Sequence, residues 1–229
     1  DDFAIRKGHK YNTGLHDLKG GSFLQLIPGR TYEELMDHYD SHPSLKDLRP
    51  AAVVMDLAKA YHAFIRTVYP NAIRIADRFH VNRYVTEALQ KIRKQVQKTL
   101  APHAKKRLKK FHHCLSKRRD DLSPEEEKLV NELLGYDKQL KAAYLWKENF
   151  IDWYDLSLNF KQAKIGFERW CEQGRLIGHP AVNACLKTME NWKEEIMNYH
   201  KLRFTNASVE GRNNKIKTLQ RKHYFTRNP

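Results

Sequence analysis

The sequence feature that most limits the possible folds is a short apolar run, AAVVM, at 51–55, which ends at Asp56. A continuous apolar run of this length is typical of a strand that is buried on both faces, and such strands lie in parallel sheets covered by helices. A helix is predicted over 57–69, and the run AIRIA at 72–76 predicts a second strand that ends at Asp77. Strand, helix and strand form a βαβ unit, so the first third of the chain is predicted to be α/β.

Polar sites in such sheets gather at the carboxyl ends of the strands, where Asp56 and Asp77 both fall. Each aspartate also has a structural alternative. Asp56 stands where a helix N-cap is common, and Arg78 directly follows Asp77 and could neutralise it. The residues by themselves leave both alternatives open.

The chain before this unit is predicted to contain a β-hairpin and a short helix. The strands are expected at 11–18 and 22–27, because the Lys-Gly-Gly sequence between them is typical of a turn. Thr31 and Glu34 have the spacing of a capping box, which predicts a helix over 32–39.

Helical periodicity replaces the strand signals from Phe79 to about His200. Ser-Pro-Glu-Glu at 123–126 is a strong helix start. Further helices are expected at 138–156, 159–173 and 181–200. Their four tryptophans suit a core, although base stacking is an alternative. Because no Gly/Ser linker separates this region from its neighbours, we interpret it as an insertion packed onto the α/β fold.

The balance of charge indicates a polyanionic partner. Lys and Arg number 42 against 27 Asp and Glu, which gives a formal charge of +15. Nucleic acid is favoured over an anionic membrane surface, because no segment is typical of an anchor. No apolar run could span a bilayer and no signal-peptide pattern is present, so we expect a soluble intracellular protein. The segment Lys91–Arg119 carries twelve Lys and Arg and no acid. It could contact phosphates or could be a solvated helical face.

The three cysteines do not indicate a disulfide framework, because they are odd in number and far apart. Reduced and mostly buried thiols are expected. His112-His113-Cys114 could suggest a metal site, but it lies among basic residues with no second ligand pair nearby in the sequence. We therefore interpret it as part of the basic face.

A third acid of interest is Glu210, in the segment TNASVEGRNNKIKTLQRKHYFTRN. On a helix, Glu210, Lys217 and Arg221 would share one face with Asn213 or Asn214. One acid beside a row of bases and amides suits a helix that lies along a phosphate backbone. An incidental glutamate on a surface helix is the alternative.

Converging acids would be needed for chemistry on a phosphodiester. Two divalent metal ions held by carboxylates stabilise the charge on both the attacking and the leaving oxygen. Asp56 and Glu210 are candidates from separate elements. Asp1 and Asp2 are neighbours on a presumed strand, so only one of them can face Asp56, and the local pattern does not choose between them.

Four stretches, DDFAIRKGHKY, VVMDLAKAY, ADRFHV and VEGRNNKIK, resemble in this order the catalytic region of bacterial insertion-sequence transposases of the ISL3 family. The resemblance covers nearly the whole chain. It implies an α/β fold: a ribonuclease-H-like mixed-sheet core formed by 1–80 and 201–229, with an all-helical insertion at 81–200 before the last catalytic acid. It also implies a DDE triad of Asp1, Asp56 and Glu210 that binds Mg²⁺ or Mn²⁺, as two ions.

The family also implies a function, namely metal-dependent cleavage at transposon ends and transfer of the freed 3′-hydroxyl to target DNA. Such an enzyme is expected to act as a homo-oligomer on DNA, in the bacterial cytoplasm with the nucleoid. The supporting residues around the triad are expected to be Asp77, His80, Asn213 and Asn214. The residues expected to contact DNA phosphates are Lys105, Lys106, Arg107, Lys215, Lys217, Arg221 and Lys222.

Two features qualify the resemblance. The ending HYFTRN replaces the usual Tyr-Gly-Phe of the family, which predicts an altered local backbone there. The chain begins at Asp-Asp without Met, so we expect a segment of a longer protein whose zinc-binding and helix-turn-helix regions lie outside it. The alternative functions are a catalytically inactive or domesticated DNA-binding module, and a ribonuclease-H-like nuclease without strand transfer.

Overall fold

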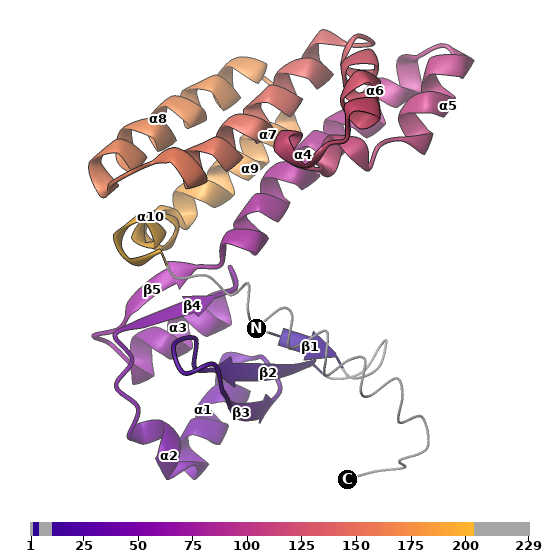
Figure 1. The fold of residues 1–229 in the computed structure, drawn as a ribbon. Helices are drawn as coiled ribbons and strands as arrows, with labels where there is room; N and C mark the ends of the chain where they lie inside the picture. Colours follow the sequence, from indigo (N-terminus) through magenta and orange to yellow (C-terminus); the bar gives the residue numbers. More distant parts are fainter. Residues whose placement is uncertain (1, 5–10, 204–229) are drawn as a thin grey trace, which may run out of the picture. The chain divides into compact units, whose positions relative to one another are not determined.

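The computed structural model describes residues 2–4 and 11–203, and the chain divides into two compact units between Phe79 and His80. We call the first, which holds the described residues up to Phe79 and those after Lys201, the α/β unit. The second, His80–Lys201, is the helical unit (Figure 1). The fold is therefore mixed α/β with small sheets and a large helical part. The assignment of the two units as a ribonuclease-H-like core and its insertion stays a prediction.

The α/β unit contains two sheets among its described strands. An antiparallel sheet has the order β1-β2-β3, formed by β1 (Asp2–Ala4), β2 (Tyr11–His16) and β3 (Phe23–Pro28). The second sheet pairs β4 (Ala52–Met55) with β5 (Ile73–Ala76) in parallel. The predicted hairpin and the predicted βαβ strands are thus confirmed. A single mixed sheet joining all five strands is not formed among the described residues.

Of the helices in the α/β unit, the first begins where its capping box predicts, the third begins two residues after its predicted start, and the short second one was not predicted. They are α1 (Tyr32–Ser41), α2 (Pro43–Lys46) and α3 (Lys59–Val68). Both hydrogen bonds of the predicted capping box between Thr31 and Glu34 are present at the start of α1. The helix α1 packs against α3 and β3 (Figure 1). Tyr69 directly follows α3, and its hydroxyl donates a hydrogen bond to the carbonyl oxygen of Leu45 at 2.8 Å. Burial raises the pKa of Tyr69 to about 12.

One expectation about β4 is only partly met. The run at 51–55 predicted a strand buried on both faces, but Ala52, Val53 and Val54 are half-buried and only Met55 is fully buried. Among the described strands β4 pairs with β5 alone, so it is not the central strand of a larger sheet there. The buried end of β4 is the end that leads to Asp56.

The helical unit is built from seven α-helices and two short 3-10 turns in its described residues. In chain order these are α4 (Arg78–Thr99), α5 (Pro102–Lys110), η1 (Cys114–Ser116), η2 (Arg119–Asp121), α6 (Pro124–Leu134), α7 (Lys138–Leu156), α8 (Phe160–Ile177), α9 (Pro180–Asn191) and α10 (Lys193–Leu202). The helix α6 begins at the predicted Ser123 cap with a complete capping box. The bounds of α7 agree with the predicted helix at 138–156. No helix in the part of the chain that the structure describes is long and apolar enough to cross a membrane.

Two predicted helices have different ends in the structure. The helix expected at 159–173 continues to Ile177, because Gly178 adopts the left-handed conformation that commonly ends a helix, with φ of 66°. The single helix expected at 181–200 is two helices, interrupted at Trp192. The acidic pair Glu194-Glu195 lies in the first turn of α10, where the helix dipole favours negative charge. This pair is the feature of the sequence that indicates the start of a separate helix.

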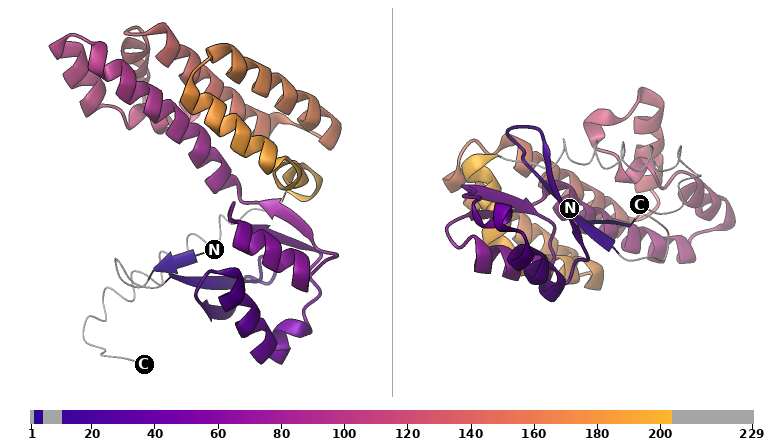
Figure 2. Two further views of the ribbon diagram at one scale, coloured as in Figure 1. Left: turned by 180° about the vertical axis from the view of Figure 1, so that it is seen from behind. Right: turned by 90° about the horizontal axis from the view of Figure 1, so that it is seen from below.

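The core of the helical unit lies where α7 packs side by side with α8 (Figure 2). The rings of Trp146 and Trp170 stack with centroids 4.6 Å apart, and each indole N–H donates to the other's backbone carbonyl. A Cβ at Gly174 would lie 2.8 Å from the indole nitrogen of Trp146, so this approach requires glycine. Three of the four tryptophans are buried and Trp192 is half-buried, which confirms core packing for the three.

Candidate metal centre

The carboxyl ends of β4 and β5 bring two aspartates together. The parallel register pairs Met55 with Ala76, so the next residue of each strand, Asp56 and Asp77, leaves the sheet at the same edge. The ladder continues one step further, because the backbone N–H of Asp77 donates to the carbonyl oxygen of Met55 at 2.8 Å. This is the juxtaposition that the sequence predicted from the βαβ unit.

A histidine joins the two carboxylates. The helix α4 begins directly after Asp77, which places His80 in its first turn. One ligand atom from each of Asp56, Asp77 and His80 lies within 4.8 Å of the others. Asp56 and Asp77 are 8% and 3% exposed. We call this group of three side chains the strand-end cluster.

The strand-end cluster fits a cation. Two carboxylates and an imidazole whose ligand atoms all lie within 4.8 Å of one another can bind one ion between them. Carboxylate oxygens are the ligands that Mg²⁺ and Mn²⁺ prefer, and an imidazole nitrogen is a further possible ligand for a transition metal. The donor set therefore suits a divalent ion. The helix N-cap alternative for Asp56 is not observed, because α3 has Ala58 as its N-cap and no side-chain cap hydrogen bond.

The other predicted site residues lie outside the described residues. These are Asp1, Glu210, Asn213, Asn214, Lys215, Lys217, Arg221 and Lys222. The strand β1 starts at Asp2, of which only the backbone is described, so the choice between Asp1 and Asp2 stays open. The roles of all these residues stay predictions. The family resemblance implies supporting roles for Asp77 and His80, and the structure places both beside Asp56.

The predicted phosphate contacts in α5 differ in their surroundings. Lys105 and Lys106 are exposed. Arg107 instead donates two hydrogen bonds to the carboxylate of Glu132 on α6, and these hydrogen bonds raise the pKa of Arg107. Arg107 therefore forms an ion pair within the helical unit. Lys109 and Lys110 are exposed on the same helix, so they join the candidate contacts, and the role of Arg107 stays a prediction.

Comparisons with known proteins agree on one class. A family model described as Transposase, of the DDE type and named for ISL3, matches residues 1–229. The chain is 28% identical over 229 residues to the transposase for insertion sequence element IS1001 of Bordetella parapertussis, an alignment that covers 98% of this chain and 56% of that protein. It is 23% identical over 252 residues to the transposase for insertion sequence element IS1557 of Mycobacterium tuberculosis, covering 100% of this chain and 56% of that protein. The chain thus spans about half the length of these relatives. No solved structure matches it.

Proposed function

Because the chain belongs to the ISL3 family of insertion-sequence transposases, we propose that it is the catalytic part of a DDE-type enzyme that cuts DNA at transposon ends and joins them to target DNA. The observation that supports this most directly is the strand-end cluster. Two buried carboxylates, Asp56 and Asp77, meet at the end of a parallel strand pair inside a strongly basic chain. A basic surface alone would suit any DNA-binding protein, whereas two carboxylates and an imidazole brought together at a strand end also offer the ligands of a divalent ion.

In this proposal Asp56 binds Mg²⁺ or Mn²⁺ together with Asp1 and Glu210, as the family motif implies. A divalent ion, once bound, supplies stabilisation of negative charge on the attacking and leaving oxygens of the phosphodiester. Asp77 and His80 lie close enough to Asp56 to orient its carboxylate or to share the ion. Asn213 and Asn214 would support the site from the helix of Glu210. The chain's ribonuclease-H-like core and its assembly as a homo-oligomer on DNA belong to the same proposal.

The exposed lysines of α5 are proposed to hold the phosphate backbone. The helix presents four exposed lysines and, among its described side chains, no acid. Such a row neutralises phosphates and releases their counterions, which makes binding dependent on salt. The proposed contacts are Lys105, Lys106, Lys109 and Lys110, together with the predicted Lys215, Lys217, Arg221 and Lys222.

The proposed chemistry is tested by assays with transposon-end DNA, either intact or already cut to expose its 3′-hydroxyl. With Mn²⁺ or Mg²⁺ we expect cleavage of the intact DNA and joining of the cut DNA to a target, and a chelator should abolish both. Cleavage without joining of the cut DNA would identify a nuclease. DNA binding without either reaction, and without binding of Mn²⁺, would identify an inactive DNA-binding module.

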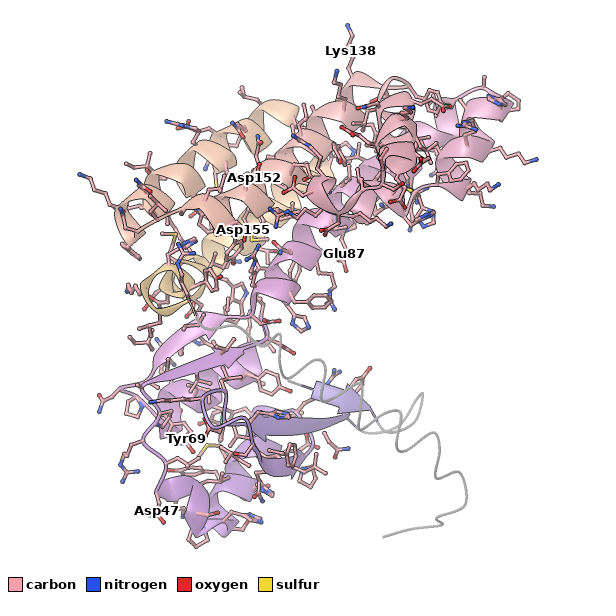
Figure 3. All side chains as sticks on the ribbon, in the orientation of Figure 1. Asp47, Tyr69, Glu87, Lys138, Asp152 and Asp155 are labelled. Carbon is pink, nitrogen blue, oxygen red and sulfur yellow. The ribbon has the colours of Figure 1, made fainter. Side chains whose placement is uncertain are left out.

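Replacing two of the α5 lysines should weaken DNA binding without affecting its sequence preference. For Lys105→Ala combined with Lys106→Ala, the slope of log affinity against log salt concentration should fall by about two, since each lost phosphate contact removes about 0.9. The measurement is fluorescence anisotropy over a series of salt concentrations. Lys138→Ala is the matched control, because Lys138 is exposed at the first position of α7 and outside the basic run (Figure 3). An unchanged slope in the double variant would exclude α5 from the interface.

A further inference from the structure

A second group of metal-ligating side chains lies within the helical unit, around the segment that joins α5 to α6. Cys114 is the first residue of η1, and His113 precedes it. Glu126 comes from the first turn of α6. The sulfur of Cys114 lies 3.4 Å from Nε2 of His113 and 3.9 Å from Oε1 of Glu126. One ligand atom from each residue lies within 4.8 Å of the others.

We propose that His113, Cys114 and Glu126 form a zinc site, with the fourth position open to water. Zinc–sulfur and zinc–nitrogen bonds of about 2.3 and 2.0 Å at a tetrahedral angle place neighbouring ligand atoms about 3.5 Å apart. The two separations from the Cys114 sulfur, 3.4 and 3.9 Å, are close to that value. A thiolate beside an imidazole selects zinc over the harder Mg²⁺, so this site and the strand-end cluster would take different metals.

The carboxylate of Glu126 is already oriented for this role. In the capping box of α6, Oε2 of Glu126 accepts a hydrogen bond from the backbone N–H of Ser123 at 3.1 Å. The hydroxyl of Ser123 in turn accepts one from the N–H of Glu126 at 3.2 Å. These bonds fix one carboxylate oxygen and leave Oε1 facing Cys114, and hydrogen bonding of this kind to metal ligands raises metal affinity.

Lys117 is the competitor that zinc must displace. Its ammonium nitrogen lies 2.5 Å from Oε1 of Glu126, the oxygen assigned to the metal. The side chain of Lys117 is 42% exposed, so it can turn into solvent, and an exposed ion pair of this kind contributes little to stability. Burial, and then the charge of Glu126, raise the pKa of Cys114 while Lys117 lowers it. Zinc binds a cysteine as its thiolate, so metal binding would release the proton of the thiol.

The zinc site would connect the end of the basic helix α5 to the start of α6. The sequence around His113-Cys114 does not predict this site, because no second ligand pair lies nearby in the chain. The missing ligand is Glu126, which follows Cys114 by twelve residues and is brought back by the turn of η1 and η2. This inference does not depend on the proposed DNA chemistry, since none of its three residues belongs to the strand-end cluster.

The proposal is tested with protein from which metal has been removed. Calorimetry measures the binding of Zn²⁺, and absorption spectroscopy measures the binding of Co²⁺. A bound Co²⁺ should show a thiolate-to-cobalt charge-transfer band. Cys114→Ser should abolish the band, and His113→Asn should weaken zinc binding by at least about tenfold, since even outer partners of a metal site contribute that much. Cys171→Ser and His112→Asn are matched controls, because each replaces a residue of the same type outside the group, and both should keep the band.

Lys117→Ala provides a variant whose expected result cannot arise from misfolding. Removal of the competing ammonium should tighten zinc binding by roughly two- to fivefold, which corresponds to an exposed ion pair. Three results would each overturn the proposal. They are the absence of a charge-transfer band in the wild-type protein, a band that persists in Cys114→Ser, and weaker zinc binding in Lys117→Ala. Zinc binding that is lost only in His112→Asn would assign the metal to exposed imidazoles and overturn it as well.

Discussion

Asp56→Asn is expected to lower the rates of DNA cleavage and strand transfer by about 10³-fold or more while leaving DNA affinity nearly unchanged. The substitution keeps the size of the side chain but removes the negative charge that would hold a divalent ion beside Asp77. Metal ions contribute several kcal/mol of charge stabilisation in such reactions, and about 1.4 kcal/mol corresponds to a tenfold change in rate. Loss of one negative charge does not weaken attraction to a polyanion, so binding should persist.

The measurements are cleavage and joining rates in Mn²⁺ and Mg²⁺, with DNA affinity determined in parallel. Asp47→Asn is the matched control, because Asp47 is an exposed aspartate of the same unit, at the end of α2, and its replacement removes the same charge (Figure 3). The control should react at the wild-type rate. Cleavage that survives in Asp56→Asn would remove the strand-end cluster from the mechanism.

The same assay separates the roles of the neighbouring residues. If Asp77 orients the carboxylate of Asp56, Asp77→Asn should slow cleavage by roughly 10- to 100-fold, the usual cost of losing a partner of a metal ligand. If Asp77 shares the ion, the loss should equal that of Asp56→Asn. The binding of Mn²⁺, followed by electron paramagnetic resonance, distinguishes the two roles independently of the reaction. A wild-type rate in Asp77→Asn would contradict both roles.

The sequence predicted those elements whose signals are local. The capping boxes at Thr31 and Ser123 fixed two helix starts, because the hydrogen bonds of a cap join residues only three apart. The aspartates at the strand ends were placed together by the geometry of a parallel pair alone. The interruption at Trp192 was not predicted, since the residue itself is neither glycine nor proline.

The features that sequence reasoning missed depend on contacts between distant segments. Gly174 lies inside α8 because the indole of Trp146, on another helix, occupies the space of a side chain. The pairing of Arg107 with Glu132 on α6 has no signal in the run of bases that contains Arg107. A ribonuclease-H-like core has no local signature either: the described strands form two sheets, and the assignment of the core stays a prediction.

Breaking a buried ion pair in α7 is expected to cause a large loss of stability in the helical unit. Lys147 and Glu148 are 1% and 2% exposed and contact each other. The ammonium of Lys147 also donates to the carbonyl oxygen of Lys117 at 2.6 Å, and Glu148 accepts from the backbone N–H of Arg119 at 3.0 Å. The pair thus holds the segment after η1 against α7. Burial lowers the pKa of Lys147, because it removes the charged ammonium from water.

Lys147→Met should therefore lower the free energy of unfolding by about 3–5 kcal/mol, because it leaves the carboxylate of Glu148 buried without its counter-charge. The double variant with Glu148→Met should recover part of that loss, since an apolar pair of similar volume avoids the desolvation cost. Urea denaturation followed by tryptophan fluorescence measures both. Lys141→Met, on the exposed face of the same helix, should change stability by no more than about 0.5 kcal/mol. A double variant that is less stable than Lys147→Met alone would show that the hydrogen bond to Arg119, and not the unpaired charge, dominates the loss.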